Sequence, residues 1–361
     1  MFKKKTIKDV DIKDQVVLLR ADYNVPLGKN DRGELKVMSD FRITAGLPTI
    51  KYLLEHEAKK IIVISHLGRP KGRDEELTLR VVAERLASLL PSVTVGFVND
   101  CRGDEVEQAV EEMPKGSILM LENLRFDSGE KKNDEFFAED IVRSTGATLF
   151  VQDGFAVTHR THASTVAIAK LLPAVAGLLI EKEVTMLRNA LEKPKHPFVT
   201  IIGGAKVADK QPLIDEFLPV ADRLIIGGKI AADGYTSENP QVYVAEDFDE
   251  NEAGEKLDVG PVSTCKIVDM LSGAKTVLWN GVLGKVEDPA YATSSVIVAK
   301  YLGENDKITS IICGGDTSGF VEELQINNPS LNYSLVSTGG GAALQLLSNG
   351  EMPGLDALEN K

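Results

Sequence analysis

Short apolar runs rich in β-branched residues recur along the chain, each followed by glycine or polar residues and then by an amphipathic stretch. They are QVVLLR (15–20), KIIVISH (60–66), SILMLEN (117–123), TLFVQD (148–153), FVTIIGG (198–204), RLIIGG (223–228), TVLWNG (276–281), SIICGG (310–315) and YSLVSTGG (333–340). Such runs are typical of strands whose two faces are both covered by helices, as in parallel sheets. The sequence therefore predicts an α/β fold with crossover helices.

The length predicts two domains, because 361 residues are about twice a typical domain of roughly 150. In the segment 171–197, apolar residues fall at helical spacing from Leu178 onward, which indicates a long helix joining two sheets. We therefore expect a first domain over residues 1–175, an interdomain helix over 176–195 and a second domain over 196–346. The acidic segment 237–256 has few large apolar residues, and we expect a surface excursion there rather than a core element.

Composition excludes several classes of partner. The chain has 41 basic and 54 acidic residues, and a net charge of -13 disfavours nucleic acid and anionic membranes as partners. Its three cysteines, Cys101, Cys265 and Cys313, have no metal-binding spacing and are expected to be free thiols in a reducing compartment. No uncharged apolar run approaches about 18 residues, so we expect a cytoplasmic protein without a membrane span.

Polar and charged residues of the first half follow four successive predicted strands. They are Asp22 and Asn24, then His66 and Arg69, then Arg125, and finally His159, Arg160 and His162, while Arg42 is expected to join them from the loop before the first helix. A lone arginine is more often a salt-bridged surface residue. Here, however, the residues follow four strands, and the carboxyl ends of parallel strands meet at one edge of the sheet. Several guanidinium groups at one edge can bind phosphate or carboxylate bidentately. The pattern predicts an anion site. A zinc site is not favoured, because His159 and His162 have no thiols or paired carboxylates at metal-site spacing.

Glycine clusters mark the strand ends of the second half, where neither GxGxxG nor GxxxxGK[ST] occurs. They are Gly203–Gly204, Gly227–Gly228, Gly314–Gly315 and Gly339–Gly341. Glycine allows close backbone approach, and a helix that begins directly after it points its N–H groups at a phosphate. With Lys206, Lys210, Asp316 and Thr317 nearby in sequence, the four clusters predict a nucleotide site with its metal.

Nine motifs resemble, in this order, those of the phosphoglycerate kinase family. They are RADYNVPL, SHLGRPKG, LENLRF, THRTHAST, GGAKVADK, DVGP, WNGVLG, GGDT and STGGGAA, and they extend over about residues 15 to 358. The resemblance implies two Rossmann-like three-layer α/β/α domains with parallel sheets, joined by a hinge helix. It also implies a monomer that transfers the acyl phosphate of 1,3-bisphosphoglycerate to MgADP in glycolysis, after the hinge has closed. The tail 347–361 resembles the family's C-terminal segment that completes the first domain.

The resemblance also implies a role for individual residues of the first domain. Phosphoglycerate would be held by Asp22, Tyr23, Asn24, Arg42, His66, Leu67, Gly68, Arg69, Arg125 and Arg160, with His162 close by. Arg42 would be catalytic, because its guanidinium would lie beside the transferring phosphoryl group, which requires fixed donors and no protein nucleophile.

For the second domain, the resemblance implies that Lys206 and the N–H groups of Gly339, Gly340 and Gly341 act on the transferring group. Lys210 would contact the nucleotide phosphates, Asp316 would ligate Mg²⁺ and Thr317 would cap the helix beside it. The nucleoside would lie against Gly203, Gly204, Gly227, Gly228, Asn280 and Glu287, with Gly314 and Gly315 at the phosphates.

The chain departs from the family chiefly in the segment from 229 to 257, which is much shorter than usual. This shortening leaves two alternatives open. One is a catalytically silent nucleotide-binding relative, which the intact Arg42, Lys206, Lys210 and Asp316 disfavour. The other is a different acyl-phosphate kinase, such as an acetate or carbamate kinase, which would not explain the cluster of arginines and histidines.

Overall fold

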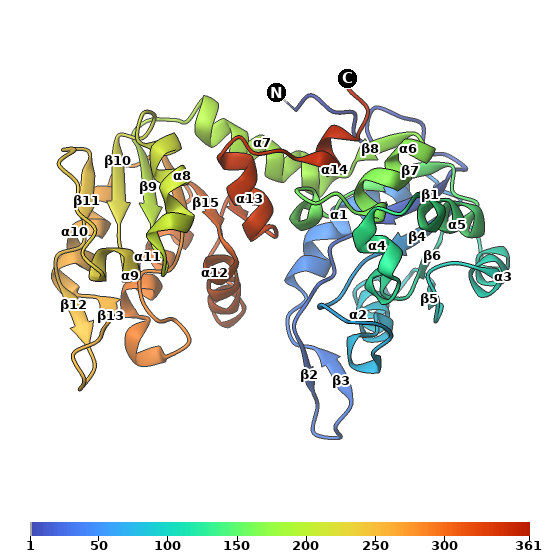
Figure 1. Ribbon diagram of the computed structural model, residues 1–361, viewed down its shortest axis with the longest axis horizontal. Coiled ribbons are helices and arrows are strands. Elements are labelled where there is room, and N and C mark those ends of the chain that lie inside the picture. Colours follow the sequence, from blue (N-terminus) through green and yellow to red (C-terminus); the bar gives the residue numbers. More distant parts are fainter. Residues whose placement is uncertain (1) are drawn as a thin grey trace. The chain divides into compact units, whose positions relative to one another are not determined.

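The structure is a computed structural model that describes residues 2–361. The chain divides into two compact units: the first extends to Lys182 and includes Glu351–Lys361, and the second is Glu183–Gly350. Each unit has its own parallel six-stranded sheet with helices around it (Figure 1). The expected α/β class is thus confirmed. The helix predicted from Leu178 onward is α7 (Leu178–Glu192), and it contains the point at which the two units divide.

The sheet of the first unit has the strand order β5-β6-β4-β1-β7-β8, with parallel neighbours throughout. Four predicted runs form its centre, as β1 (Val16–Arg20), β4 (Lys60–Ile64), β6 (Ser117–Met120) and β7 (Leu149–Gln152). The edge strands β5 (Val95–Phe97) and β8 (Ala174–Ala176) were not predicted, because three residues give no periodicity.

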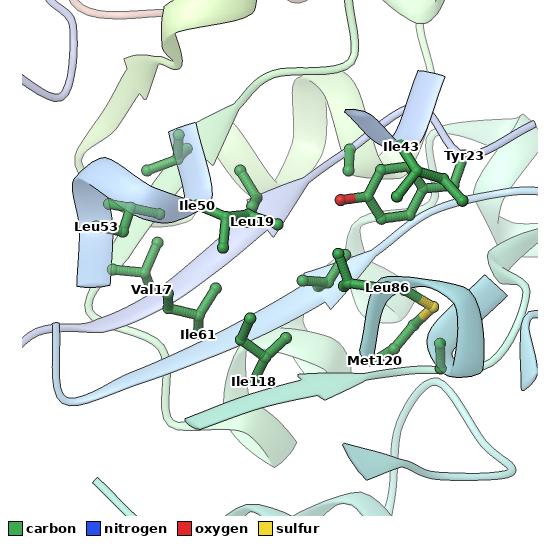
Figure 2. Packing of buried hydrophobic residues seen from close by; sticks show 14 of the residues in the cluster. Val17, Leu19, Tyr23, Ile43, Ile50, Leu53, Ile61, Leu86, Ile118 and Met120 are labelled. Carbon is green, nitrogen blue, oxygen red and sulfur yellow. The ribbon is translucent and has the colours of Figure 1, made fainter. Parts of the chain in front are cut away.

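Helices cover both faces of this sheet. They are α1 (Phe41–Glu55), α2 (Arg80–Leu89), α3 (Asp104–Glu112), α4 (Ser128–Lys132), α5 (Glu135–Thr145), α6 (Ile168–Leu171) and α14 (Pro353–Asp356), with a π-helical turn over Ala163–Ala167. Figure 2 shows Val17 and Leu19 of β1 packed beside Ile50 and Leu53 of α1, and all four side chains are buried. A hairpin of β2 (Leu27–Lys29) and β3 (Leu35–Val37) extends from this unit.

The sheet of the second unit has the order β11-β10-β9-β14-β15-β16 and is also parallel. Its predicted strands are β9 (Phe198–Ile202), β10 (Arg223–Ile226), β14 (Thr276–Asn280), β15 (Thr309–Cys313) and β16 (Leu335–Val336). Its helices after α7 are α8 (Val207–Phe217), α9 (Gly228–Ala232), α10 (Pro261–Leu271), α11 (Thr293–Gly303), α12 (Gly315–Asn327) and α13 (Gly340–Leu347). The glycine clusters therefore lie between strand ends and helix starts.

The expectation of a mere surface excursion over 237–256 is wrong in part. This segment contains β11 (Val242–Val244), which pairs with β10 in the main sheet, and β12 (Phe248–Glu250), which pairs with β13 (Lys256–Val259) in a hairpin. The side chains of β11 are only partly buried, since an edge strand has one neighbour. A strand can therefore have few large apolar residues and still belong to the sheet.

The C-terminal residues pair with the first unit. The backbone N–H of Lys5 donates to Glu359 O at 2.8 Å, and the N–H of Glu359 donates to Ala174 O at 3.0 Å. Leu355 and Leu358 are buried. Among residues 2–361, all three cysteines are free thiols and no helix is long and apolar enough to cross a membrane.

Candidate functional site

A connected group of charged side chains lies at the carboxyl end of β1 and β4. Arg42, in the first turn of α1 and not in the preceding loop as expected, donates from Nη1 to Asp22 Oδ2. Asp22 Oδ1 lies 4.0 Å from His66 Nδ1, which also lies 3.0 Å from Arg20 Nη2. Because a guanidinium can only donate, His66 Nδ1 accepts this hydrogen bond and its proton is on Nε2. The ring is thus held in one tautomer.

The same group continues from Arg20 to the π-helical turn. Arg20 Nε donates to Ser164 Oγ at 2.8 Å, and this hydroxyl donates to Glu130 Oε1 at 2.7 Å. Glu130 also accepts from the backbone N–H of Ser164 at 3.0 Å, and His162 Nδ1 lies 3.6 Å away, within ion-pair range. Glu130 and Arg20 are both fully buried. Buried charges require partners, and these two are tied together through one serine.

Glycine, asparagine and arginine fix the turn that follows β4. Gly68 has φ +62, and its N–H donates to Asn24 Oδ1 at 2.8 Å. Its carbonyl accepts from Arg125 Nη1 at 2.5 Å. Asn123 binds both backbone groups of Leu67, at 3.2 and 2.8 Å. Residues of three strand ends thus hold one another in place.

Several donors in this half-site remain free to bind a ligand. Arg125 Nε is buried and has no hydrogen-bond partner among residues 2–361. The expectation that Tyr23 binds phosphoglycerate through its side chain is wrong, because that side chain is buried in the hydrophobic core beside α1 (Figure 2). Arg69 is exposed, and Arg160 donates from Nε to His159 Nε2 at 3.2 Å. A buried donor without an acceptor is rare in a protein, and an oxyanion ligand would satisfy it.

The pKa shifts describe a strongly positive environment. Burial, followed by the charges of Arg20, Arg125, Arg160 and Arg42, lowers the pKa of His66 well below its ordinary value. Burial and these four guanidinium groups together disfavour the charged imidazolium form. Burial also lowers the pKa of Arg125 to about 10, with Arg160 and Arg20 acting in the same direction. The arrangement can bind a small anion that carries several negative charges.

Arg20 and Glu130 were not predicted as site residues. Arg20 ends the apolar run QVVLLR. A charged residue at the last position of a buried strand could have indicated that Arg20 belongs to the site. Glu130 lies in a short helix with Lys131 and Lys132, and nothing in that polar sequence distinguishes it.

The second unit contains a cavity of about 260 Å³ at the carboxyl ends of its strands. Four predicted site residues line it: Gly204, Gly228, Glu287 and Asp316. The other lining residues are Ala205, Lys229, Ala232, Phe248, Lys256, Leu257, Asp258, Val282, Leu283, Gly284 and Lys285. Its size and its mixture of apolar walls with a few charges suit a small organic ligand.

Glycines let three loops meet at this cavity. A Cβ on Gly203 would lie 2.6 Å from Gly281 O, and one on Gly228, which has φ +59, would lie 2.7 Å from Val282 O. A Cβ on Gly227 would lie 2.5 Å from Leu283 Cδ2. These glycines allow the loops to pack against one another, and Gly228 lines the cavity together with Gly204.

Helices α12 and α13 begin side by side, since a Cβ on Gly340 would lie 2.5 Å from Gly315 N. The N-cap residues of these helices are Gly314, with φ +101, and Gly339. Gly315 has nothing within 4 Å of its Cβ position, and both Gly341 and Lys206 are exposed. Two adjacent helix N-termini present unpaired N–H groups and a positive dipole end to an anion.

Three polar side chains, Lys210, Asn280 and Thr317, hold this region in place. Lys210 donates from Nζ to Asn280 Oδ1, and Asn280 Nδ2 lies 3.3 Å from Cys313 Sγ. Burial lowers the pKa of Lys210. Thr317 lies within α12, so the expectation that it caps the helix is wrong. Instead, its hydroxyl accepts from the N–H of Gly281 at 2.8 Å and fixes the loop after β14.

Asp316 is the predicted metal ligand, and it is exposed in the first turn of α12 at the cavity wall. No group of three or more His, Cys, Asp or Glu side chains able to hold a metal occurs within residues 2–361. A single carboxylate at a phosphate site suits Mg²⁺, which takes its other ligands from phosphate oxygens and water.

Comparison with known proteins identifies the family. The family model "Phosphoglycerate kinase" matches residues 7–242 and 231–350. The phosphoglycerate kinase of Pseudothermotoga lettingae is 39% identical over 411 residues, covering 100% of both chains, and that of Lactobacillus gasseri is 38% identical over 412 residues, covering 98% of this chain and 99% of the relative. The alignment with the Pseudothermotoga lettingae protein has 411 positions, whereas this chain has 361 residues. About fifty positions of the alignment therefore have no residue in this chain. The two matched segments of the family model overlap at 231–242, within the segment expected to be shortened.

Solved structures agree with the sequence comparison. The crystal structure of phosphoglycerate kinase from Pyrococcus horikoshii superposes with a TM-score of 0.83 at 26% identity, and the Coxiella burnetii enzyme with 0.76 at 29%, each covering 98% of both chains. The chain belongs to the phosphoglycerate kinase family.

Proposed function

We propose that the two half-sites divide the phosphoglycerate kinase reaction between them, with phosphoglycerate in the first unit and the nucleotide in the second. The reaction is the reversible transfer of the acyl phosphate of 1,3-bisphosphoglycerate to ADP, which gives 3-phosphoglycerate and ATP. The observation that carries the proposal is the connected group Arg42, Asp22, His66 and Arg20, with the buried free donor of Arg125 beside it.

Phosphoglycerate would bind to the arginines and to the turn after β4. Arg125, Arg160 and Arg69 supply positive charge, and neutral His66 can donate from Nε2. Asn24 and Asp22 orient the turn and Arg42. Arg42 is half-buried and anchored at one nitrogen, which leaves its other donors for the equatorial oxygens of the transferring group.

The nucleotide would lie in the cavity, with its phosphates at the starts of α12 and α13. Gly315 and Gly339–Gly341 would supply N–H groups, and Lys206 and Lys210 would supply charge. Asp316 would hold Mg²⁺, which neutralises phosphate charge when bound. Glu287 would bind the sugar hydroxyls, while buried Asn280 would act through Lys210.

Because the half-sites belong to different units, we infer that transfer requires the units to close around both substrates. A monomer in the cytoplasm, without nucleic acid or membrane partners, fits the family and the charge of -13. The alternative of a silent relative is not favoured, since the site residues of the family motifs are present.

The test is a coupled assay with 3-phosphoglycerate and MgATP, with Arg42→Ala as the decisive variant. We expect turnover by the wild type and a fall in kcat of about 10²–10³ in the variant, as for loss of a donor to transition-state charge. The dissociation constant of ADP should change little. Arg85→Ala is the control, because Arg85 pairs with Asp40 on the surface. Absence of turnover, or a change in KM alone for Arg42→Ala, would refute the assignment.

A further inference from the structure

The β12–β13 hairpin forms one end of the nucleotide cavity. Phe248 of β12 and Lys256 of β13 both line the cavity, and Lys256 Nζ lies 4.8 Å from the centroid of the Phe248 ring. The hairpin is tied to the loop after β14 by the N–H of Lys285, which donates to Leu257 O at 2.8 Å. Within the second unit, the hairpin and α12 lie on opposite sides (Figure 1). A nucleotide with its phosphates at α12 therefore has its base at the hairpin.

Few polar groups at that end are free to read a base. Lys229 Nζ is held by Asp233 Oδ1 at 2.7 Å. Asp258 is buried, and it accepts from the N–H of Ser294 at 3.0 Å and from the Ser294 hydroxyl. Lys256 is exposed, makes no side-chain hydrogen bond or ion pair with residues 2–361, and has its ammonium group over the Phe248 ring. Apolar walls are supplied by Ala232, Leu257 and Leu283.

The chemistry of an ammonium group separates the two purine classes. Guanine and hypoxanthine present two adjacent acceptors, O6 and N7, whereas adenine replaces O6 with an amino group that donates. A lysine can only donate, so it can bind both acceptors of a 6-oxopurine but meets a second donor at adenine. We propose that Lys256 makes this site prefer 6-oxopurine nucleotides, with guanine or hypoxanthine as base, over adenine nucleotides. The inference rests on the proposed nucleotide site and names the base that this site selects.

The test compares the binding of GDP, IDP and ADP by calorimetry, in the full-length wild type and in Lys256→Met. We expect GDP and IDP to bind about tenfold more tightly than ADP in the wild type, and this preference to vanish in the variant. Loss of one positive charge weakens the binding of every nucleotide. The informative quantity is therefore the ratio of the GDP or IDP affinity to the ADP affinity. Lys229→Met is the matched control: it removes the same charge from the same cavity, but its ammonium is already held by Asp233. It should leave the ratio unchanged.

Three outcomes would overturn the inference: tighter binding of ADP than of GDP in the wild type, an unchanged ratio in Lys256→Met, or a preference for GDP that IDP does not share. The last would indicate recognition of the 2-amino group by a carboxylate. The coupled assay with 3-phosphoglycerate and MgATP tests the proposed function separately. Turnover with an unchanged affinity ratio would refute only the role of Lys256, whereas a shifted ratio without turnover would refute only the reaction.

Discussion

At the scale of single residues, two buried carboxylates organise the anion half-site. Asp22 holds Arg42, and Glu130 holds Ser164 and lies beside His162. Burial alone would raise the pKa of Glu130, but His162, Arg20 and Ser164 together bring it below its ordinary value, so the carboxylate stays charged. The arginines can therefore be crowded at one edge because two anions are buried among them.

His159 makes the free energy of unfolding vary with pH in the acidic range. Burial, then the charges of Arg160 and His162, lower its pKa from 6.5 to about 4. Between these two values the unfolded chain binds a proton on this residue that the folded chain does not, so stability falls as the pH decreases through this window. Protonation would also remove the acceptor for Arg160 Nε.

We expect His159→Gln to make the loss of thermal stability between pH 6.5 and pH 4 less steep than in the wild type. The measurement is the melting temperature at half-unit steps of pH, with both proteins also compared at pH 8, where the imidazole is neutral in both states. Parallel curves over the acidic window would contradict the assigned pKa.

Which residues the sequence could predict depends on what fixes their position. Asp22, His66 and Arg125 follow apolar strands, and the rule that carboxyl ends share an edge was enough to group them. Arg20 and Glu130 meet only through Ser164, which is 144 residues from Arg20 and 34 from Glu130. Contacts over such separations have no local pattern in the sequence.

At the scale of elements, apolar strands were predicted well and edge strands poorly. Every predicted run became a strand of one of the two sheets, because two covered faces require continuous apolar residues. The edge strands β5, β8 and β11 were missed because each is only three residues long, whereas the edge strand β16 was predicted. Glycine clusters were correctly expected at strand ends. The sequence did not show that Gly203 and Gly228 also let their loops pack against the 281–282 loop, because that contact joins distant parts of the chain.

Gly203 tests this packing between loops. In Gly203→Ala the new Cβ would overlap the backbone of the 281–282 loop, which no side-chain rotation can relieve, so we expect a loss of about 1–3 kcal/mol of stability and weaker ADP binding. Gly319→Ala is the control, because the Cβ position of Gly319 in α12 is open and alanine favours a helix by about 0.5–1 kcal/mol.

The single tryptophan provides the measurement. Trp279 is fully buried in β14, so its fluorescence during urea unfolding reports on the second unit. Equal midpoints for the wild type and Gly203→Ala would show that the loops can separate at no cost.

At the scale of the whole molecule, the chain begins and ends in the same unit. The last eleven residues, Glu351–Lys361, are assigned to the first unit, and Gly354 N–H donates to Thr158 O at 2.8 Å, one residue from His159. Gly354 is tightly fitted there, since its Cβ would lie 3.0 Å from Thr158 Cα. The tail thus supports the segment that carries Arg160 and His162.

We expect a chain truncated after Gly350 to lose the anion half-site and keep the nucleotide cavity. Removing buried Leu355 and Leu358 strips apolar cover from the first unit, and Leu355→Ala alone should cost about 2–5 kcal/mol. The truncated chain should therefore bind ADP and retain the Trp279 unfolding transition, while binding of 3-phosphoglycerate is lost. Calorimetry with each ligand separates the two effects. If 3-phosphoglycerate still bound with wild-type affinity, the first unit would have to be complete without its tail, and the buried contacts of Leu355 and Gly354 would have no bearing on the site.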